Sequence, residues 1–305
     1  MISILINVFV TSVILLTILL SNKTAEKANG NILLGVSLPY SELENNEALK
    51  IVQGFHKTYT LAGLISVFLM LPLLIISKYV SISIIYILVW CCLVFYSSYI
   101  IQKKYFNKLY QLKREKGWFI EERQNIGIDT DECQFWVSGF YYNPNDKRVW
   151  VEKRFGIGTT TNMASWFGKL IYVFLAATII ATIALSIFLM PLDFGSVDLE
   201  VKNNIVFINA PMRNDSFSLT DIQDIKQVND LPKMSKRNGG DSDNFYVGRF
   251  HVQGYNKCSV YVHRNNPPYI FVTLSDRIVI LNGNTPEKTE EYYLLLTKEK
   301  NKFIY

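Results

Sequence analysis

The side chains best able to carry chemistry are few in this 305-residue chain, and they do not cluster. The four cysteines lie at positions 91, 92, 133 and 258, and the one close pair is vicinal within an apolar run, so neither a metal site nor a disulfide framework is indicated. The three histidines are equally scattered. No Gly-x-Ser-x-Gly, His-Glu-x-x-His or Asp-rich repeat is present, so the sequence predicts no catalytic residue, metal ligand or cofactor.

Two stretches are candidate contacts for phosphate or lipid headgroups. The first contains Arg154, Gly156 and Gly158, where a guanidinium and exposed backbone amides could hold an anion, although no third glycine or Walker lysine follows. The alternative for this stretch is a segment that lies on the bilayer surface and leads into the next apolar run, with Trp166 and Phe167 at the interface.

The second stretch is the basic segment that opens with Lys103, Lys104 and Lys108. Its lysines are interleaved with tyrosine, phenylalanine and leucine, a pattern that predicts an amphipathic helix. Such a helix either holds anionic lipid headgroups or carries its lysines as a topology signal, with their ammonium groups at the interface.

Four nearly charge-free runs must position these residues, and all four are interpreted as membrane spans. Residues 61–101 contain one charged side chain, Lys78, and a straight helix of that length would extend about 60 Å, twice the hydrocarbon core of a bilayer. This run is therefore predicted to be a helical hairpin with its turn at residues 77–81. Pro72 is predicted to kink the first arm, and a neighbouring helix must then satisfy the freed carbonyl.

The two remaining runs are residues 1–22 and 170–192. No Lys or Arg precedes the first run, unlike a signal peptide, so it is interpreted as an uncleaved helix with its N-terminus outside. The last run carries Ala177, Ala181 and Ala184 at helical spacing, which predicts close contact with another helix, within the bundle or between copies of the chain.

The connections between the spans set the topology. Residues 21–59 hold four lysines and residues 102–167 hold eleven Lys and Arg, whereas the hairpin turn holds Lys78 alone. By the positive-inside rule both long connections are predicted to be cytoplasmic, and the turn and residues 193–305 extracytoplasmic. In the first connection, Ser41 and Glu44 have the spacing of a capping box, so a helix is predicted over residues 42–59.

After Pro191 the pattern changes to short β-rich runs separated by turn residues. Seven or eight antiparallel strands are predicted, with a mobile loop at residues 236–243. Thr285, Pro286 and Glu287 are typical of a helix start. The helix that follows is expected to direct Tyr292, Leu295 and Leu296 toward the sheet. The predicted fold is thus a domain of four transmembrane helices over residues 1–192, and an antiparallel β barrel or sandwich with a terminal helix over residues 193–305.

Several stretches resemble known bacterial families. The order of strands and terminal helix resembles that of a bacterial pleckstrin-homology-like (PH-like) domain, and so do residues 265–270 and 286–290 within it. Residues 140–162 are similar to a short domain of unknown function found in bacterial integral membrane proteins, and residues 32–59 are similar to a loop in the same group. The resemblance implies a membrane protein loosely allied to the SdpI-type immunity family, whose members protect cells against secreted toxins.

These observations favour a non-catalytic, multi-pass protein of the cell membrane. Its C-terminal domain is expected to bind a protein, peptide or lipid partner at the membrane surface through exposed strand edges. With 14 cationic and 14 acidic residues in 193–305, a nucleic-acid surface is not expected there. The alternative is a membrane-embedded hydrolase acting on lipid or envelope substrates. Transport ranks below both, because the polar residues of the four spans are small side chains and Asn7, with no Asp, Glu, Lys, Arg or His.

Overall fold

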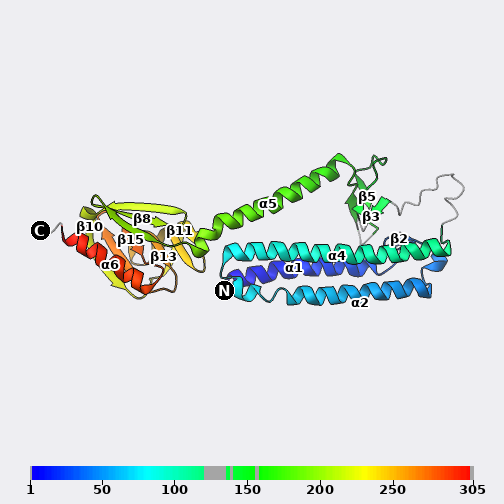
Figure 1. Cartoon of the computed structure of the whole chain (residues 1–305), viewed down its shortest axis with the longest axis horizontal. Helices are drawn as coiled ribbons and strands as arrows, with labels where there is room; N and C mark the ends of the chain where they lie inside the picture. Colours follow the sequence, from blue (N-terminus) through cyan, green and yellow to red (C-terminus); the bar gives the residue numbers. More distant parts are fainter. Residues whose placement is uncertain (1, 120–134, 138–139, 155–157, 303–305) are drawn as a thin grey trace. The chain divides into compact units, whose positions relative to one another are not determined.

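The computed structural model describes residues 2–119, 135–137, 140–154 and 158–302 (Figure 1). Cys133 and Gly156, both considered above, lie outside these residues. The chain divides into two compact units, one formed by Met1–Ile75 and Ile85–Ile183 and the other by Ile76–Ile84 and Ala184–Tyr305.

The first unit is built mainly from long apolar helices. The helices of the N-terminal two thirds are α1 (Ile2–Ala25), α2 (Asn46–Phe68), α3 (Leu73–Ile76), α4 (Val80–Lys116) and α5 (Trp166–Phe194). Among the described residues, three helical segments are long and apolar enough to cross a membrane: Asn46–Ile76, Val80–Lys116 and Trp166–Phe194. The apolar stretch of α1, Ile4–Leu20, is shorter than these three.

Pro72 interrupts the first arm of the predicted hairpin. Helix α2 ends at Phe68, and the short helix α3 resumes directly after the proline, at Leu73. The carbonyl oxygen of Leu69 accepts a hydrogen bond from Tyr86 Oη of α4 at 2.5 Å. The carbonyl that Pro72 frees is that of Phe68, four residues earlier, and it accepts from the N–H of Leu71 at 3.1 Å within the break itself. The prediction that a neighbouring helix satisfies this carbonyl is therefore wrong, although α4 satisfies that of the next residue, Leu69.

The start of α2 differs from the prediction. Ser41 lies in a short 3-10 turn, Tyr40–Glu42, and α2 begins at Asn46. The side chain of Asn45 caps the helix by accepting from the backbone N–H of Glu47 at 2.9 Å. The predicted capping box at Ser41 and Glu44 is therefore wrong, because asparagine, an equally good cap, lies one residue before the helix.

Three small strand pairs pack with the adjoining ends of the helices. The pairs are β1 (Ile32–Leu33) with β2 (Val36–Ser37), β3 (Trp136–Val137) with β4 (Phe140–Tyr141), and β5 (Trp150–Glu152) with β6 (Thr159–Thr161). Their buried side chains Val36, Trp136 and Val151 share one apolar cluster with Phe55 of α2 and Leu109 of α4. This shared core fixes the connections to the helix ends.

The second unit contains a domain of nine strands and one helix within the described residues. Its elements are β7 (Asp198–Lys202), β8 (Ile205–Ala210), β9 (Arg213–Ser218), β10 (Ile222–Val228), β11 (Met234–Asp241), β12 (Phe245–Val252), β13 (Tyr255–His263), β14 (Tyr269–Leu274), β15 (Ile278–Leu281) and α6 (Pro286–Asn301). One sheet has the order β7-β8-β9, and the other has the order β10-β14-β15-β13-β12-β11. Pairing is antiparallel except between β13 and β15, which run parallel.

The predicted loop at residues 236–243 is wrong, since most of it belongs to strand β11. Gly239 pairs with Gly248 of β12, and the two have φ values of 144° and 119°. A Cβ added to Gly239 would lie 2.0 Å from the carbonyl oxygen of Val247, so the glycine pair allows the two strands to cross closely. Glycines that usually indicate a loop here permit a twisted strand pair.

Helix α6 closes one face of the domain, as predicted. Thr285 caps it by accepting from the N–H of Lys288 at 3.2 Å. Tyr292 and Leu296 are buried in the main core with strand residues such as Ile208 and Val279, and the partly buried Leu295 packs against that core. Tyr292 Oη also donates to the carbonyl oxygen of Val197 at 2.8 Å, so the helix is joined to the segment before β7.

Candidate functional site

Asp193, near the end of α5, caps the first turn of α4. Its carboxylate accepts from the backbone N–H of Val80 at 3.1 Å and of Ser81 at 2.7 Å, and from Ser81 Oγ at 2.6 Å. The first amides of a helix have no intrahelical acceptor, and the positive end of the helix dipole favours a carboxylate there. Asp193 therefore provides the cap that the sequence around Val80 lacks.

Other polar contacts hold the same hairpin turn. Ser186 Oγ donates to the carbonyl oxygen of Ser81 at 2.6 Å, and Asn244 Nδ2 donates to that of Lys78 at 2.9 Å. Tyr79 and Phe194 stack with 5.2 Å between ring centroids. We term these contacts, with those of Asp193, the turn clamp. It joins the turn, the end of α5 and the β11–β12 loop within one compact unit.

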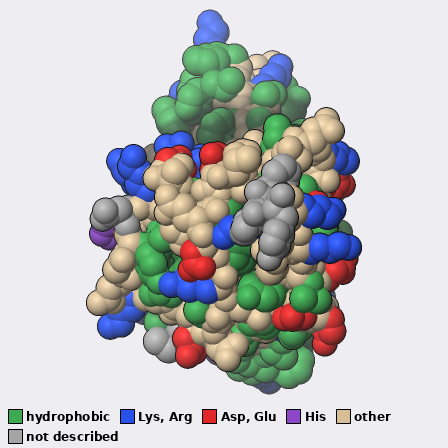
Figure 2. All heavy atoms as spheres, turned by 90° about the vertical axis from the view of Figure 1, so that its left-hand side faces the viewer, with side chains coloured by type: hydrophobic (Ala, Val, Ile, Leu, Met, Phe, Trp, Pro, Cys, Tyr) green, Lys and Arg blue, Asp and Glu red, His purple; other side chains and the backbone are tan. Residues whose placement is uncertain are grey.

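Charges on the C-terminal domain are mixed in sign. Arg264 lies over the ring of Tyr246 at 4.3 Å and 3.6 Å from an oxygen of Asp241, so its charge is already partnered. Figure 2 shows Lys and Arg side chains interspersed with Asp and Glu on the face drawn. No group of three or more His, Cys, Asp or Glu suited to a metal ion occurs among the described residues.

Strand β11 presents an open edge. It is the last strand of its sheet, so one row of its backbone groups has no strand partner among the described residues. The residues from Ser235 to Gly239 are exposed, and a bulge between Lys236 and Asn238 leaves Arg237 outside the register. Charged residues and bulges often protect an edge strand from pairing. Here the charged residues, Lys236 and Arg237, also make the edge cationic.

The polar cluster that most resembles a catalytic group, around Asp215, holds strands together. Asp215 of β9 accepts from Tyr261 Oη and from Arg277 Nη2, each at 2.9 Å. Burial, followed by the nearby Asp215 charge, raises the pKa of Tyr261 well above its usual value. Each oxygen of the carboxylate is thus engaged in joining β9 to β13 and to the turn before β15.

The residues predicted to contact lipid or phosphate fall into two groups. Lys103 lies 5.9 Å from the ring centroid of Tyr99, and Lys104 and Lys108 lie 5.6 and 5.4 Å from that of Tyr105, all on α4. The Arg154 guanidinium instead lies 5.6 Å from the ring centroid of Trp136 in β3. Gly158 has φ 101°, and its carbonyl oxygen accepts from Lys153 N–H at 2.8 Å. Their contact with lipid stays a prediction.

Asn162 organises the turn between β4 and β5, a role that the sequence analysis missed. It is fully buried, and its Nδ2 donates to the carbonyl oxygens of Asn143 at 2.8 Å and Asp146 at 3.0 Å. Its Oδ1 accepts from the N–H groups of Asn143 and Ala164, both at 3.1 Å. Asn162 therefore links the turn to the residues that lead into α5, and only the abundance of turn-forming residues nearby hinted at it.

Ala177, Ala181 and Ala184 are all exposed in the single chain. In the most apolar window of α5 only 6% of residues are buried, against 22% in each of the other two candidate spans. Both predicted contacts of the alanine stripe, within the bundle and between copies of the chain, stay predictions.

Two parts of the chain match known families. Residues 197–296 match the family described as Bacterial PH domain, and residues 144–169 match a family of unknown function, DUF5808. Searches of curated proteins and of solved structures gave no significant match. The C-terminal domain is thus a bacterial PH domain, and the part of the chain that the structure describes contains three helices long and apolar enough to cross a membrane.

The second match includes Asn162 and the turn that it holds. It overlaps residues 140–162, which were expected to resemble a domain of unknown function. Neither match supports the expected alliance with the SdpI-type immunity proteins, which stays a hypothesis.

Proposed function

We propose that this protein is a non-catalytic, multi-pass membrane protein whose PH domain binds an extended, acidic segment of a partner protein outside the cytoplasm. The observation that carries the proposal is the open edge of β11. An extended segment can pair with the free backbone groups of such an edge, while side chains determine which segment fits. Lys236 and Arg237, exposed on this edge, favour acidic side chains in the partner.

A protein partner is favoured over a lipid by the charges of this domain. Residues 193–305 carry 14 cations and 14 acids, so no excess of positive charge would attract an anionic membrane. Arg264, close to the turn clamp, is already engaged with Asp241. The cationic edge of β11 is therefore better suited to a local acidic segment than to a charged surface.

The proposed sidedness is supported by two independent observations. The hairpin turn holds one lysine, whereas residues 102–167 hold eleven Lys and Arg. By the positive-inside rule, a turn with so few cations is expected outside the cytoplasm. Residues 76–84, which include the turn, form one compact unit with residues 184–305, and this supports a PH domain on the same side of the membrane as the turn.

Photocrosslinking in native membranes tests this proposal. A photoreactive amino acid at Ser235, in the full-length chain, is expected to give an adduct with a discrete protein. The same probe at Leu294, 59% exposed on α6, is the matched control and should give none. Arg237→Glu should weaken the Ser235 adduct by repelling an acidic partner. Equal adducts from both probe positions, or an adduct that Arg237→Glu leaves unchanged, would refute binding at this edge.

A further inference from the structure

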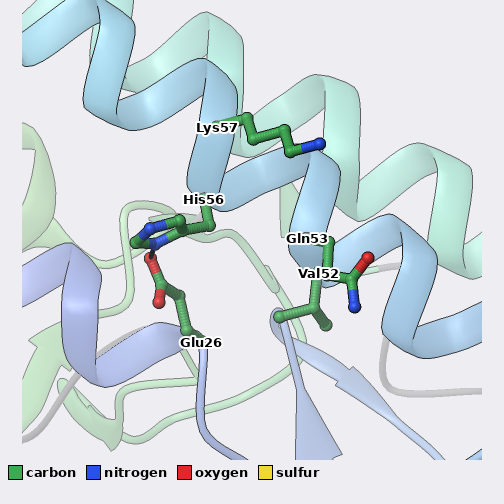
Figure 3. A pocket seen from close by; sticks show the side chains of 5 residues that line it. All are labelled: Glu26, Val52, Gln53, His56 and Lys57. Atoms are coloured by element: carbon green, nitrogen blue, oxygen red, sulfur yellow. Dashed lines mark hydrogen bonds and ion pairs between the residues drawn. The ribbon is translucent and has the colours of Figure 1, made fainter.

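A hollow lies between the end of α1 and the first turns of α2. It has a volume of about 360 Å³ and is lined by Glu26, Val52, Gln53, His56 and Lys57 (Figure 3). This volume is within the range of roughly 300–1,000 Å³ in which ligand sites occur. All five residues belong to the first compact unit.

One side of the hollow is formed by Glu26 and His56, whose Oε1 and Nδ1 atoms are 2.8 Å apart. One oxygen of the Glu26 carboxylate is engaged by His56, and the other remains an acceptor. Glu26, held in place by His56, therefore offers an acceptor atom to a small cation. The Glu26 side chain is 21% exposed, so its charge is partly shielded from water.

The other side of the hollow offers donors. Figure 3 shows the Lys57 ammonium and the Gln53 amide directed away from the His56–Glu26 pair, one helical turn apart on α2. Neither side chain has a hydrogen-bond or ion-pair partner among the described residues. An ammonium and an amide at this spacing can donate together to a phosphate.

The hollow lies at the border of the apolar runs. After Lys57, residues 58–77 contain no charged side chain, and these 20 residues match the length that spans a hydrocarbon core. In α1 the charge-free run ends at residue 22, about one turn before Glu26. In a bilayer the hollow would therefore lie at the depth of the lipid headgroups.

We propose that this hollow binds the headgroup of a zwitterionic aminophospholipid, with its phosphate on Lys57 and Gln53 and its ammonium on the Glu26 carboxylate. The lining carries one acid and one permanent cation, so it matches a headgroup of zero net charge. An anionic headgroup would leave the Glu26 carboxylate facing negative charge. The inference rests on the membrane placement in the proposed function.

The test uses full-length protein in nanodiscs that contain equal amounts of phosphatidylethanolamine and phosphatidylglycerol, with retained lipids counted by native mass spectrometry. Wild type should retain phosphatidylethanolamine preferentially. Glu26→Gln should lower the ratio of phosphatidylethanolamine to phosphatidylglycerol by about tenfold, as loss of one charge-assisted contact predicts. Lys57→Gln should lower retention of both lipids, while Lys50→Gln, an exposed lysine of α2 outside the hollow, should match wild type.

Equal retention of the two lipids by wild type, or a ratio that Glu26→Gln leaves unchanged, would overturn the inference. Soluble glycerophosphoethanolamine is a separate arm, and retention of this compound without enrichment of the lipid would overturn a lipid ligand. Carbonate extraction of cell membranes separates the two proposals. A protein released by carbonate would refute the membrane placement itself, whereas an embedded protein without lipid preference would refute the headgroup site alone.

Discussion

Replacing Asp193 with alanine should open the turn clamp while the core of the PH domain stays folded. The carboxylate is the acceptor for the Val80 and Ser81 amides and for the Ser81 hydroxyl. Loss of a helix cap costs about 1 kcal/mol, and each hydrogen bond to a charged group contributes about 1.5–3 kcal/mol, without full additivity. We expect a total loss of about 3 kcal/mol in the local opening free energy.

Hydrogen exchange of the full-length protein in detergent measures this loss directly. Each 1.4 kcal/mol is a factor of about ten, so the Val80 and Ser81 amides should exchange about 100-fold faster in Asp193→Ala. Asp193→Asn, which keeps an acceptor without the charge, should lie between this variant and wild type. Asp198→Ala is the matched control, because its carboxylate accepts from Ser196 Oγ at 3.3 Å near the surface and does not contact the turn. Unchanged protection of both amides in Asp193→Ala would show that the clamp does not stabilise the turn.

Four further outcomes are expected. Asn162→Ala removes four hydrogen bonds from a fully buried amide and should lower stability by about 3 kcal/mol, detected as a lower Tm in detergent. The Arg148 guanidinium, hydrogen-bonded to Asp146, lowers the pKa of that carboxyl. The pair therefore stabilises the fold above the ordinary carboxyl pKa of about 4, and this stabilisation is lost progressively as the pH falls below that value. The Tm difference between wild type and Asp146→Asn should accordingly narrow from pH 7 to pH 3. In a cysteine-free background, an impermeant thiol reagent should label Ser275→Cys in intact cells and Lys147→Cys only after permeabilisation, and the opposite pattern would reverse the topology. Ala181→Leu should lower thermal stability or change the oligomeric state if the alanine stripe is a helix contact, and no effect would show that it faces lipid.

Features encoded by neighbouring residues could be predicted from the sequence. The charge-free runs indicated the long helices because span length depends on local hydropathy alone, and Thr285 and Pro286 indicated the start of α6 because capping acts within one turn. The cap was predicted at Ser41, whereas Asn45, a residue type that suits a helix cap equally well, provides it. Local pattern thus located the helices better than their first residues.

Features that depend on distant residues were not predictable in this way. The acceptor for the Ser81 amide is Asp193, 112 positions later, and no local periodicity connects the two. Asn162 similarly contacts residues 16 and 19 positions earlier. Strand β11 was interpreted as a loop because its glycines serve the approach of β12, a tertiary requirement that single-sequence propensities do not contain.

The turn clamp can form only after residues far later in the chain have been synthesised. The amides of Val80 and Ser81 leave the ribosome long before Asp193, and at about 5–20 residues per second the intervening 112 residues take roughly 6–22 s. During this interval the hairpin is present without the cap of its second arm. Asn244, which holds the carbonyl of Lys78, is made later still, 166 positions after the lysine. The hairpin turn can therefore adopt its final conformation only as the strands of the PH domain assemble, which makes its closure one of the last steps in the biogenesis of the chain.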